Sequence, residues 1–293
     1  MSRKEVILLS QSNRTAGLYN CHTHSHFSHD SRCNPLSSAT AALESGLSGF
    51  AITDHCDVED RNIPGGKDKI LSSAQCAAEL NREFGDRLSV MSGVEMGEAI
   101  WCPEYASDII ASAEYDIVLG SVHAVRYKNF TDPYSQINFS LLSNKETDDY
   151  LSAYFFDMAE MIQTCDFDVL SHLTCPLRYI TGKYGKSVDL ERHYGAIEEI
   201  LKAIISKNIA LEVNSSCLGP GYDKLMPDIP ILEKYAAYGG RLVTVGSDAH
   251  TADRVSFGLD TAALAVKNAG FEHLYYYKNR TPVPYGFDTE AIK

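Results

Sequence analysis

Residues Leu18-Tyr19-Asn20-Cys21-His22-Thr23-His24 form a short strand-like run that ends in two histidines, and this pattern recurs along the chain. Comparable runs end at Asp54-His55, Glu95, His123, His172 and the segment Gly246-Ser247-Asp248-Ala249-His250. Asp30 follows shortly after the first run. Imidazoles and carboxylates that converge from many strand ends can build a multi-metal hydrolytic site. The sequence therefore predicts such a site.

Longer helical patterns separate these runs. Helices are predicted at 37–47, 72–84, 103–113, 148–164, 190–207, 229–238 and 261–269, and strands at 18–22, 50–54, 88–95, 115–123, 168–172, 209–214 and 242–247. This alternation indicates parallel strands joined by crossover helices. Polar residues just after the strands favour an α/β barrel with its site at the C-terminal strand ends. An open doubly wound sheet is the alternative, but it would gather ligands at one switch point.

Length and composition favour one domain over residues 1–293, although two small domains would also fit this length. Hydrophobic residues make up 44% of the chain, which is enough for a large core, and no linker or repeat marks a boundary. The run Val6-Ile7-Leu8-Leu9 is too short for the core of a signal peptide, and no stretch approaches the roughly 20 apolar residues of a membrane span. Eight cysteines without a C-x-x-C pair fit reduced thiols and a cytoplasmic protein.

The formal net charge of −13 argues against long nucleic acid as a partner, because the phosphate backbone would be repelled. No local cluster of lysines or arginines offers an exception. Three bound divalent cations would still leave the chain acidic. The charge therefore favours a small, amine-bearing or cationic substrate over a polyanion. The oligomeric state is not predicted from the sequence.

The spacing of His22 and His24 suits chelation of one ion, since side chains two residues apart in a strand point the same way. Mixed imidazole and carboxylate ligands suit zinc, manganese or iron, whereas magnesium would require a more oxygen-rich shell.

The ordered motifs resemble those of the polymerase-and-histidinol-phosphatase (PHP) superfamily, and in particular its stand-alone histidinol-phosphate phosphatases. The motifs are His-Thr-His at 22–24, Asp30, Thr-Asp-His at 53–55, Gly-Val-Glu at 93–95, Ser-Val-His at 121–123, Ser-His at 171–172 and Gly-Ser-Asp-Ala-His at 246–250. The resemblance extends from about residue 18 to residue 260. It implies a distorted (β/α)7 TIM-like barrel, the PHP fold, that holds three divalent metal ions.

The resemblance also implies a ligand set for each ion. The first ion would be held by His22, His24, Glu95 and Asp248, the second by Glu95, His123 and His172, and the third by Asp30, His55 and His250. Glu95 would bridge the first two ions. Many relatives place a histidine where this chain has Asp30, so the third ligand set departs from the family pattern.

The activity implied by this resemblance is that of a metal-dependent phosphomonoesterase, which hydrolyses L-histidinol phosphate to L-histidinol and phosphate in histidine biosynthesis. A metal-bridging water would become hydroxide near neutral pH and attack phosphorus. The alternative within enzymes is a PHP-type phosphoesterase for another small ester, such as a nucleotide, a sugar phosphate or an oligonucleotide end. A non-catalytic metal-binding regulatory module is a third hypothesis, but no expected ligand position is empty.

Further residues are predicted to contact the substrate. Arg178 matches the phosphate-binding arginine of the family, and Arg254 could serve in the same way, although a solvated arginine at a helix start is the plainer interpretation. Asp54 and His250 are candidates to protonate the leaving group. Carboxylates for the substrate amine could come from Asp57, Glu98 or Asp253, although most such acids are simply exposed.

Two other features have plainer interpretations. His193 and His273 fall outside the motif pattern and are predicted to be surface or packing residues, while Cys21 and Cys56 are predicted to fill small buried spaces. The long connection at 124–147 has either a lid or binding role or a purely structural one.

Overall fold

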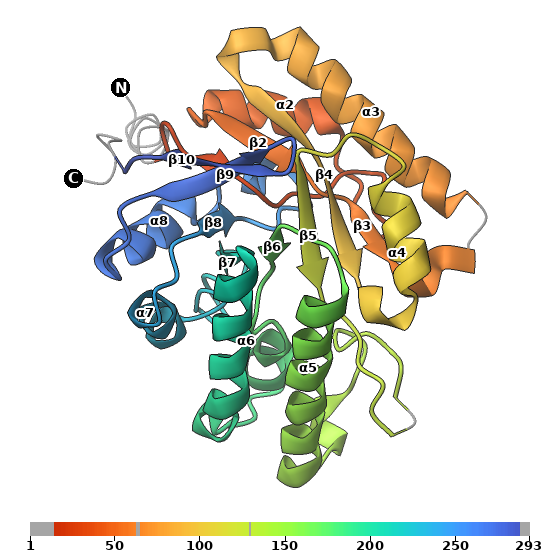
Figure 1. Ribbon diagram of the computed structural model, residues 1–293, viewed down its shortest axis with the longest axis vertical. Coiled ribbons are helices and arrows are strands. Elements are labelled where there is room, and N and C mark those ends of the chain that lie inside the picture. The colour runs from red at the N-terminus through yellow and green to blue at the C-terminus, as the bar shows by residue number, and fades with distance from the viewer. Residues whose placement is uncertain (1–14, 63–64, 129, 288–293) are drawn as a thin grey trace.

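Seven parallel strands follow one another in a single sheet in this computed structural model, which describes residues 15–62, 65–128 and 130–287 (Figure 1). They are β1 (Tyr19–Asn20), β2 (Gly49–Ile52), β4 (Ser89–Gly97), β5 (Ile117–Ser121), β6 (Val169–Leu170), β7 (Ala210–Asn214) and β8 (Val243–Gly246), and neighbours in this order pair. All seven predicted strands are present, with shorter bounds for most. The run Val6-Ile7-Leu8-Leu9 lies outside the described residues.

The two ends of this strand order meet and close the sheet into a barrel. The Cys21 amide donates to the Val245 carbonyl at 2.9 Å, and the Asp248 amide donates to the His22 carbonyl at 2.9 Å. A parallel bridge joins Thr23 to Ala249 just beyond the strands. The predicted α/β barrel is therefore confirmed, and the open doubly wound sheet is wrong.

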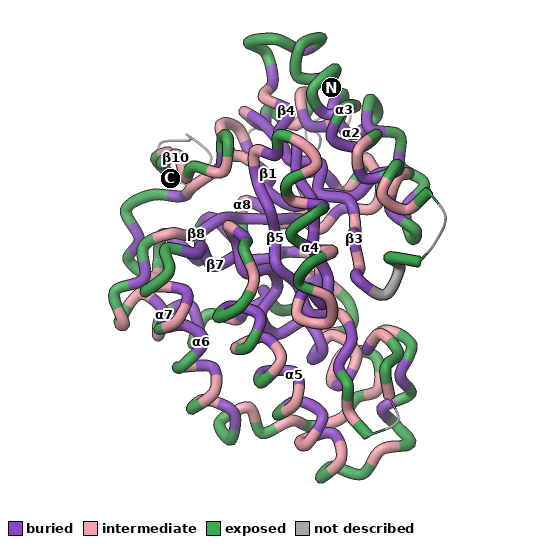
Figure 2. The backbone as a smooth tube through the Cα atoms, turned by 45° about the vertical axis from the view of Figure 1, so that its right-hand side comes forward, coloured by how far each residue is buried: buried purple, intermediate pink, exposed green. Residues whose placement is uncertain are grey.

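Helices cover the outer face of the barrel (Figure 1). They are α2 (Pro35–Glu44), α3 (Gly66–Phe84), α4 (Pro103–Ile110), α5 (Asn144–Thr164), α6 (Tyr194–Lys207), α7 (Ile229–Ala237) and α8 (Leu259–Asn268). Figure 2 shows that the strands of the barrel are largely buried while the helices alternate buried and exposed segments, as expected for amphipathic helices around a core. Within the part of the chain that the structure describes, no helix is both long and apolar enough to cross a bilayer.

Local sequence signals explain where the helices begin. Helix α5 starts at Asn144 instead of residue 148, because Ser143 and Glu146 form a capping box that satisfies the first amides. The predicted helix at 190–207 is divided into a short 3-10 turn, η6 (Leu190–His193), and α6. The segment after β6 contains one turn of π-helix, η5 (Arg178–Lys183), a rare element that frequently occurs at functional sites.

Two strand features were not predicted. The short strand β3 (His55–Asp57) pairs in parallel with the second half of β4, which places His55 opposite Glu95. Strands β9 (Leu274–Lys278) and β10 (Thr281–Tyr285) form an antiparallel hairpin.

The hairpin covers the N-terminal end of the barrel, opposite the predicted site. Tyr277 packs with the apolar side chains of the barrel interior, and its hydroxyl donates to the carbonyl of Asp168, just before β6, at 3.1 Å. Tyr276 stacks on Tyr19 with ring centroids 4.0 Å apart. The Arg280 guanidinium donates two bonds to Asp166, at 2.8 and 3.0 Å, and its Nε contacts both oxygens of Asp168, at 3.2 and 3.0 Å.

We expect the Arg280→Met variant to lower the free energy of unfolding by about 1–3 kcal/mol, because it leaves the largely buried Asp168 carboxylate without its charged partner. Urea unfolding monitored by circular dichroism measures this change. The control is Lys145→Ala, which removes an exposed ion pair with Asp149 at 2.7 Å and should change stability by less than about 0.5 kcal/mol. Equal effects of the two substitutions would contradict a stabilising role for the contact between Arg280 and Asp168.

Candidate metal centre

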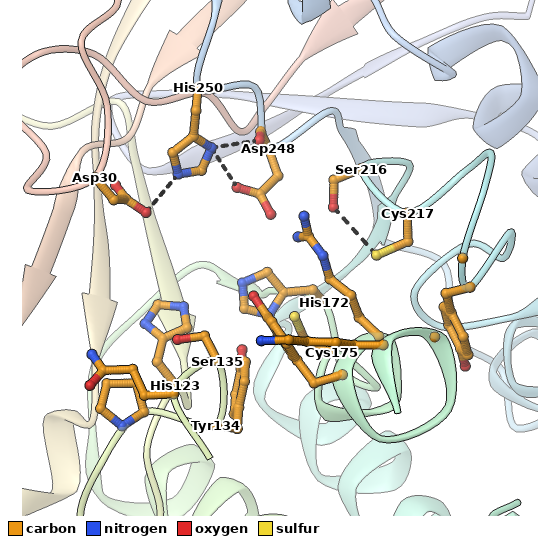
Figure 3. Close-up of a pocket in the computed structure, with 18 of the residues that line it drawn as sticks. Asp30, His123, Tyr134, Ser135, His172, Cys175, Ser216, Cys217, Asp248 and His250 are labelled. Carbon is orange, nitrogen blue, oxygen red and sulfur yellow. Dashed lines mark hydrogen bonds and ion pairs between the residues drawn. The ribbon is translucent and has the colours of Figure 1, made fainter. Parts of the chain in front are cut away.

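The predicted metal ligands all converge at the C-terminal end of the barrel. His22 and His24 follow β1, His55 lies in β3, Glu95 lies in β4, His123 follows β5, His172 follows β6, Asp248 and His250 follow β8, and Asp30 comes from the connection after β1. A cavity of about 790 Å³ opens beside them. Figure 3 shows Asp30, Asp248 and His250 on one side of this cavity and His123, Tyr134 and Ser135 on the other.

Glu95 is the centre of the cluster and is fully buried. Its Oε1 lies 3.1 Å from His123 Nε2 and 2.9 Å from His172 Nε2, while its Oε2 lies 3.2 Å from His22 Nε2 and 3.0 Å from His55 Nδ1. Burial alone would raise the pKa of the Glu95 carboxyl, but the surrounding imidazoles of His22, His123 and His55 hold that pKa well below its ordinary value. Glu95 is therefore an ionised carboxylate shared by several imidazoles.

His22, His24 and Asp248 form one group of potential ligands. The two Nε2 atoms are 3.1 Å apart, and Asp248 Oδ1 lies 3.2 Å from His24 Nε2 and 3.8 Å from His22 Nε2. Burial and the nearby imidazoles of His55 and His250 lower the pKa of His24 to about 3, so its ring is neutral at pH 7. A separation near 3 Å suits two nitrogens that each lie about 2 Å from one ion.

A second group surrounds Asp30. Its Oδ2 lies 3.0 Å from His250 Nε2 and 3.6 Å from His55 Nε2, and its side chain is 42% exposed. His250 Nδ1–H donates to the Asp248 carbonyl at 2.9 Å, which leaves Nε2 of the neutral ring with a lone pair. His24, His55 and His250 also converge, so His24 lies within reach of two groups, which the sequence did not indicate.

Unpartnered buried atoms show that divalent cations fit this cluster. His55 Nδ1 and Glu95 Oε2 approach to 3.0 Å, yet neither has a hydrogen bond among the described residues. Buried polar atoms without partners are costly and rare in folded proteins. Nitrogen lone pairs and carboxylate oxygens directed at one another would be satisfied by zinc-like cations between them.

Glu212 supports this cluster and was missed by the sequence analysis. It lies in β7, is fully buried, and its Oε1 lies 2.7 Å from His22 Nδ1 while its Oε2 accepts from the His172 amide at 2.8 Å. A Cβ at position 246 would lie 2.2 Å from Oε1, so Gly246 leaves the space that Glu212 needs. The available signal was an acid inside the apolar predicted strand at 209–214, since a buried carboxylate requires partners.

Asp54 does not lie where a leaving-group acid must be, and that hypothesis is corrected here. Its carboxylate is 1% exposed, does not line the cavity, and accepts from the Ser25 amide at 2.6 Å and from the hydroxyls of Ser25, Ser28 and Ser73 at 2.7, 2.8 and 2.5 Å. Ser28 also contacts His24 Nδ1 at 3.1 Å. Asp54 therefore fixes the connection that carries His24.

His250 was the other candidate for the leaving-group acid. Its Nδ1 contacts the Asp248 carbonyl at 2.9 Å and its Nε2 contacts Asp30 at 3.0 Å, so both ring nitrogens already have partners and neither is free for a leaving group. The geometry favours a ligand role for His250.

The two candidate arginines line the cavity but differ in their contacts. Arg254 donates to the Ser216 carbonyl at 3.2 Å and stacks on the Phe257 ring, with its guanidinium carbon 3.6 Å from the ring centroid. The Arg178 guanidinium lies 5.7 Å from the Tyr179 ring centroid and has no hydrogen bond or ion pair among residues 15–62, 65–128 and 130–287. Arg178 is thus the arginine that is available to an anion.

The three carboxylates predicted for a substrate amine are in different environments. Asp57 lines the cavity, whereas Asp253 is exposed and does not line it. Glu98 is 1% exposed and accepts from the amides of His123 and Ala124, which corrects its predicted contact with substrate. Burial, followed by the nearby Asp57 carboxylate, raises the pKa of Glu98 from 4.5 to about 8.

The connection between β5 and α5 forms part of the cavity wall through Pro133, Tyr134, Ser135 and Gln136. The Tyr134 amide donates to the His123 carbonyl at 2.9 Å, so this wall is attached to the metal centre. These contacts support the binding interpretation of the segment.

The plainer assignments are confirmed for four residues. His193 is a buried packing residue beside Asp148, at 3.0 Å, His273 is exposed, and Cys21 and Cys56 are buried.

Comparison with known proteins agrees with this architecture. The PHP domain model matches residues 20–216, and the chain belongs to this family. It is 31% identical to a histidinol-phosphatase of Lactococcus lactis over 86% of this chain and 91% of the relative, and 28% identical to a probable histidinol-phosphatase of Clostridium acetobutylicum over 89% and 97%.

Two solved structures are also similar. The crystal structure of the Lactococcus lactis histidinol phosphate phosphatase in complex with zinc, L-histidinol and phosphate matches with a TM-score of 0.71 and 26% identity, over 92% of this chain and 99% of that one. A putative histidinol phosphatase of Listeria monocytogenes matches with a TM-score of 0.71 but 13% identity, over 83% and 99%, and so shows the fold alone.

We expect the Glu212→Ala variant to lower metal affinity about 10- to 100-fold, because it removes the carboxylate that orients His22. Competition with a chromophoric chelator measures this affinity. The matched control is Glu233→Ala on the exposed face of α7, which should bind metal as the wild type does. Unchanged affinity in Glu212→Ala would refute the supporting role of this residue.

The raised pKa of Glu98 predicts a pH effect on the metal-free protein. A carboxyl whose pKa rises on folding contributes stability fully below its unfolded pKa, near 4.5, and loses that contribution as the pH rises through about 8. The free energy of unfolding should therefore fall less between about pH 5 and pH 8 in Glu98→Gln than in the wild type. Urea unfolding measured at several pH values in this range tests the prediction, with the exposed Glu199→Gln as control. The same change in unfolding free energy with pH in all three proteins would contradict it.

Proposed function

We propose that this chain is a metal-dependent phosphomonoesterase that hydrolyses L-histidinol phosphate to L-histidinol and phosphate, and that it acts in histidine biosynthesis. The observation that carries the proposal is the cluster of imidazoles around the buried Glu95, at 2.9 to 3.2 Å, with an unpaired arginine in the adjoining cavity. The identity of the substrate is inferred from relatives named histidinol-phosphatase and probable histidinol-phosphatase, which align over most of both chains.

The metal part of the proposal is three divalent ions, of zinc, manganese or iron. The ligand sets would be His22, His24, Glu95 and Asp248; Glu95, His123 and His172; and Asp30, His55 and His250. Glu95 also groups with His22 and His172 and with His55 and His123, and His24 groups with His55 and His250. Bound there, such ions would polarise phosphoryl oxygens and lower the pKa of a water. The zinc in the Lactococcus lactis structure supports this choice of metal class.

The protein's own groups would prepare the site for this chemistry. Glu212 accepts a hydrogen bond from His22 Nδ1–H, and this contact orients the ring so that Nε2 points into the cluster. Burial would lower the pKa of His22, but Glu212, Glu95 and Asp248 raise it well above its ordinary value in the metal-free state. Metal binding therefore has to displace protons, and affinity should fall as the pH is lowered.

Arg178 is the proposed phosphate ligand. Its guanidinium can offer two parallel N–H donors to a phosphoryl group, and it has no competing carboxylate partner among the described residues. Arg254 is already held by Ser216 and Phe257, so we assign it a secondary role in binding phosphate, from the wall of the cavity.

The remaining sequence-based hypotheses stand as part of this proposal. Residues 1–293 would act as one domain, since strands from Tyr19 to Gly246 build one sheet. The partner would be a small phosphate ester and not long nucleic acid, and the site of action would be cytoplasmic.

The decisive experiment measures phosphate release from L-histidinol phosphate and from a panel of sugar phosphates and nucleotides by the zinc- or manganese-loaded protein. We expect a kcat/KM above about 10⁴ M⁻¹s⁻¹ for L-histidinol phosphate, much lower values for the panel, and loss of activity after chelation. A better substrate elsewhere in the panel would favour another small-ester phosphatase. Metal binding without turnover of any ester would favour the regulatory module.

We expect the Arg178→Ala variant to lower kcat/KM for the preferred phosphomonoester about 100-fold, because the phosphoryl group loses its charged donor, while metal content stays near that of the wild type. Steady-state kinetics and metal analysis of the same sample separate these effects. Arg192→Ala, which removes an exposed side chain of η6, is the control. Normal kinetics for Arg178→Ala would show that the phosphate contact lies elsewhere.

A further inference from the structure

Three carboxylates line the cavity, Asp30, Asp57 and Asp248, and two of them are accounted for by the metal centre. Asp248 lies between His22 and His24, and Asp30 lies between His55 and His250. Asp57 belongs to neither set, although it forms a further group with His123 and the buried Glu98, in which one potential ligand atom of each residue lies within 4.8 Å of the others. It is the remaining negative charge in a cavity that otherwise offers Arg178, Lys183 and Arg254.

The backbone presents Asp57 to the cavity in a fixed position. Asp57 ends β3 and pairs with Gly97 of β4. Its Oδ1 lies 3.1 Å from His123 Nδ1, and a Cβ at position 97 would lie 2.1 Å from the same oxygen, so the glycine makes room for this carboxylate. The side chain is 15% exposed. Among the described residues, no lysine or arginine forms an ion pair with it.

Asp57 has unused hydrogen-bond capacity in this position. One hydrogen bond from His123 uses part of the capacity of a carboxylate, which can accept about four. A cationic donor from the cavity would therefore meet a carboxylate oxygen with room to accept from it.

The distance of Asp57 from the metal centre matches the shape of the proposed substrate. His123 presents Nε2 to Glu95 at 3.1 Å and Nδ1 to Asp57 at 3.1 Å, so a single imidazole ring separates Asp57 from the cluster. In L-histidinol phosphate, the carbon that carries the amine is bonded directly to the carbon that carries the phosphate ester. An ester held between the cluster and Arg178 would keep its amine within a few ångströms of the cluster. At neutral pH an aliphatic amine is an ammonium ion.

We propose, on the basis of the phosphomonoesterase function above, that Asp57 is a specificity-determining residue that binds the ammonium group of the substrate. The same carboxylate holds His123 by one oxygen and receives the substrate amine, so recognition of the amine occurs next to a proposed metal ligand. Glu98 is buried and does not line the cavity, and Asp253 does not line it either, so Asp57 is the carboxylate among these three that the cavity exposes to a substrate.

The test compares L-histidinol phosphate with its deamino analogue, 3-(imidazol-4-yl)propyl phosphate, in the wild type and in Asp57→Asn. The asparagine keeps an acceptor for His123 but removes the charge. The wild type should prefer the amine substrate by about 10-fold or more in kcat/KM, and Asp57→Asn should reduce this preference to less than about 3-fold. If the substitution instead weakened metal binding, kcat/KM would fall for both substrates and their ratio would stay the same.

Two additional measurements keep the result decisive. Calorimetric binding of L-histidinol and of deamino-histidinol to the metal-loaded proteins should show the same loss of discrimination, and it needs no turnover. Asp253→Asn, a carboxylate outside the cavity, should retain the wild-type preference.

The outcomes separate the two proposals. A wild type that does not hydrolyse L-histidinol phosphate overturns the proposed function and this inference with it. A wild type that hydrolyses both esters equally well, or an Asp57→Asn variant that still discriminates as the wild type does in rate and in binding, overturns the role of Asp57 and leaves the phosphomonoesterase in place.

Discussion

The structure depends on one buried carboxylate. Glu95 lies in the interior with five imidazoles within 3.4 Å of its oxygens, those of His22, His24, His55, His123 and His172. A carboxylate at this depth is tolerated only where charged or hydrogen-bonding groups replace water. The barrel supplies these groups because parallel strands bring residues that are distant in sequence to one end. Outside this innermost layer lies a supporting layer of carboxylates. Glu212 contacts His22, and Asp54 fixes the connection that carries His24.

The sequence predicted the innermost layer well. Each residue of that layer follows or ends an apolar run, and in a barrel of parallel strands such positions meet at one end, so order along the chain was sufficient to predict that His22, Glu95 and Asp248 would lie together. Arg178 was predicted from the family resemblance, and it lines the cavity. The structure adds that its guanidinium lacks a partner among the described residues, whereas Arg254 has two contacts.

The supporting layer could not be predicted, for physical reasons. Adjacent residues of an extended chain point in opposite directions, so Asp54 and His55 could not both face the cavity. The family resemblance placed His55 at the metal site, but the partners that Asp54 finds on the other side come from Ser25, Ser28 and Ser73, which no motif marks. Glu212 resembles an ordinary polar residue in a strand until its two partners are in place. Strand β3 has three residues and gains stability by pairing with β4, and the sequence of β10 contains two prolines, which argue against a strand unless it lies at an edge.

The closure of the barrel between β1 and β8 has a consequence for the order of assembly in the cell. The amide of Cys21 has its partner at Val245, and His22 has Asp248 as a neighbour, so the first and last strands of the sheet must both be present before the ion site is complete. A chain emerging from the ribosome would expose His22 and His24 long before Asp248 is synthesised. Such contacts between distant positions form late and slowly. Before that point, His22 and His24 could bind a metal ion from solution only weakly, as two ligands without the rest of the site. The complete ligand set would form only when the barrel has closed.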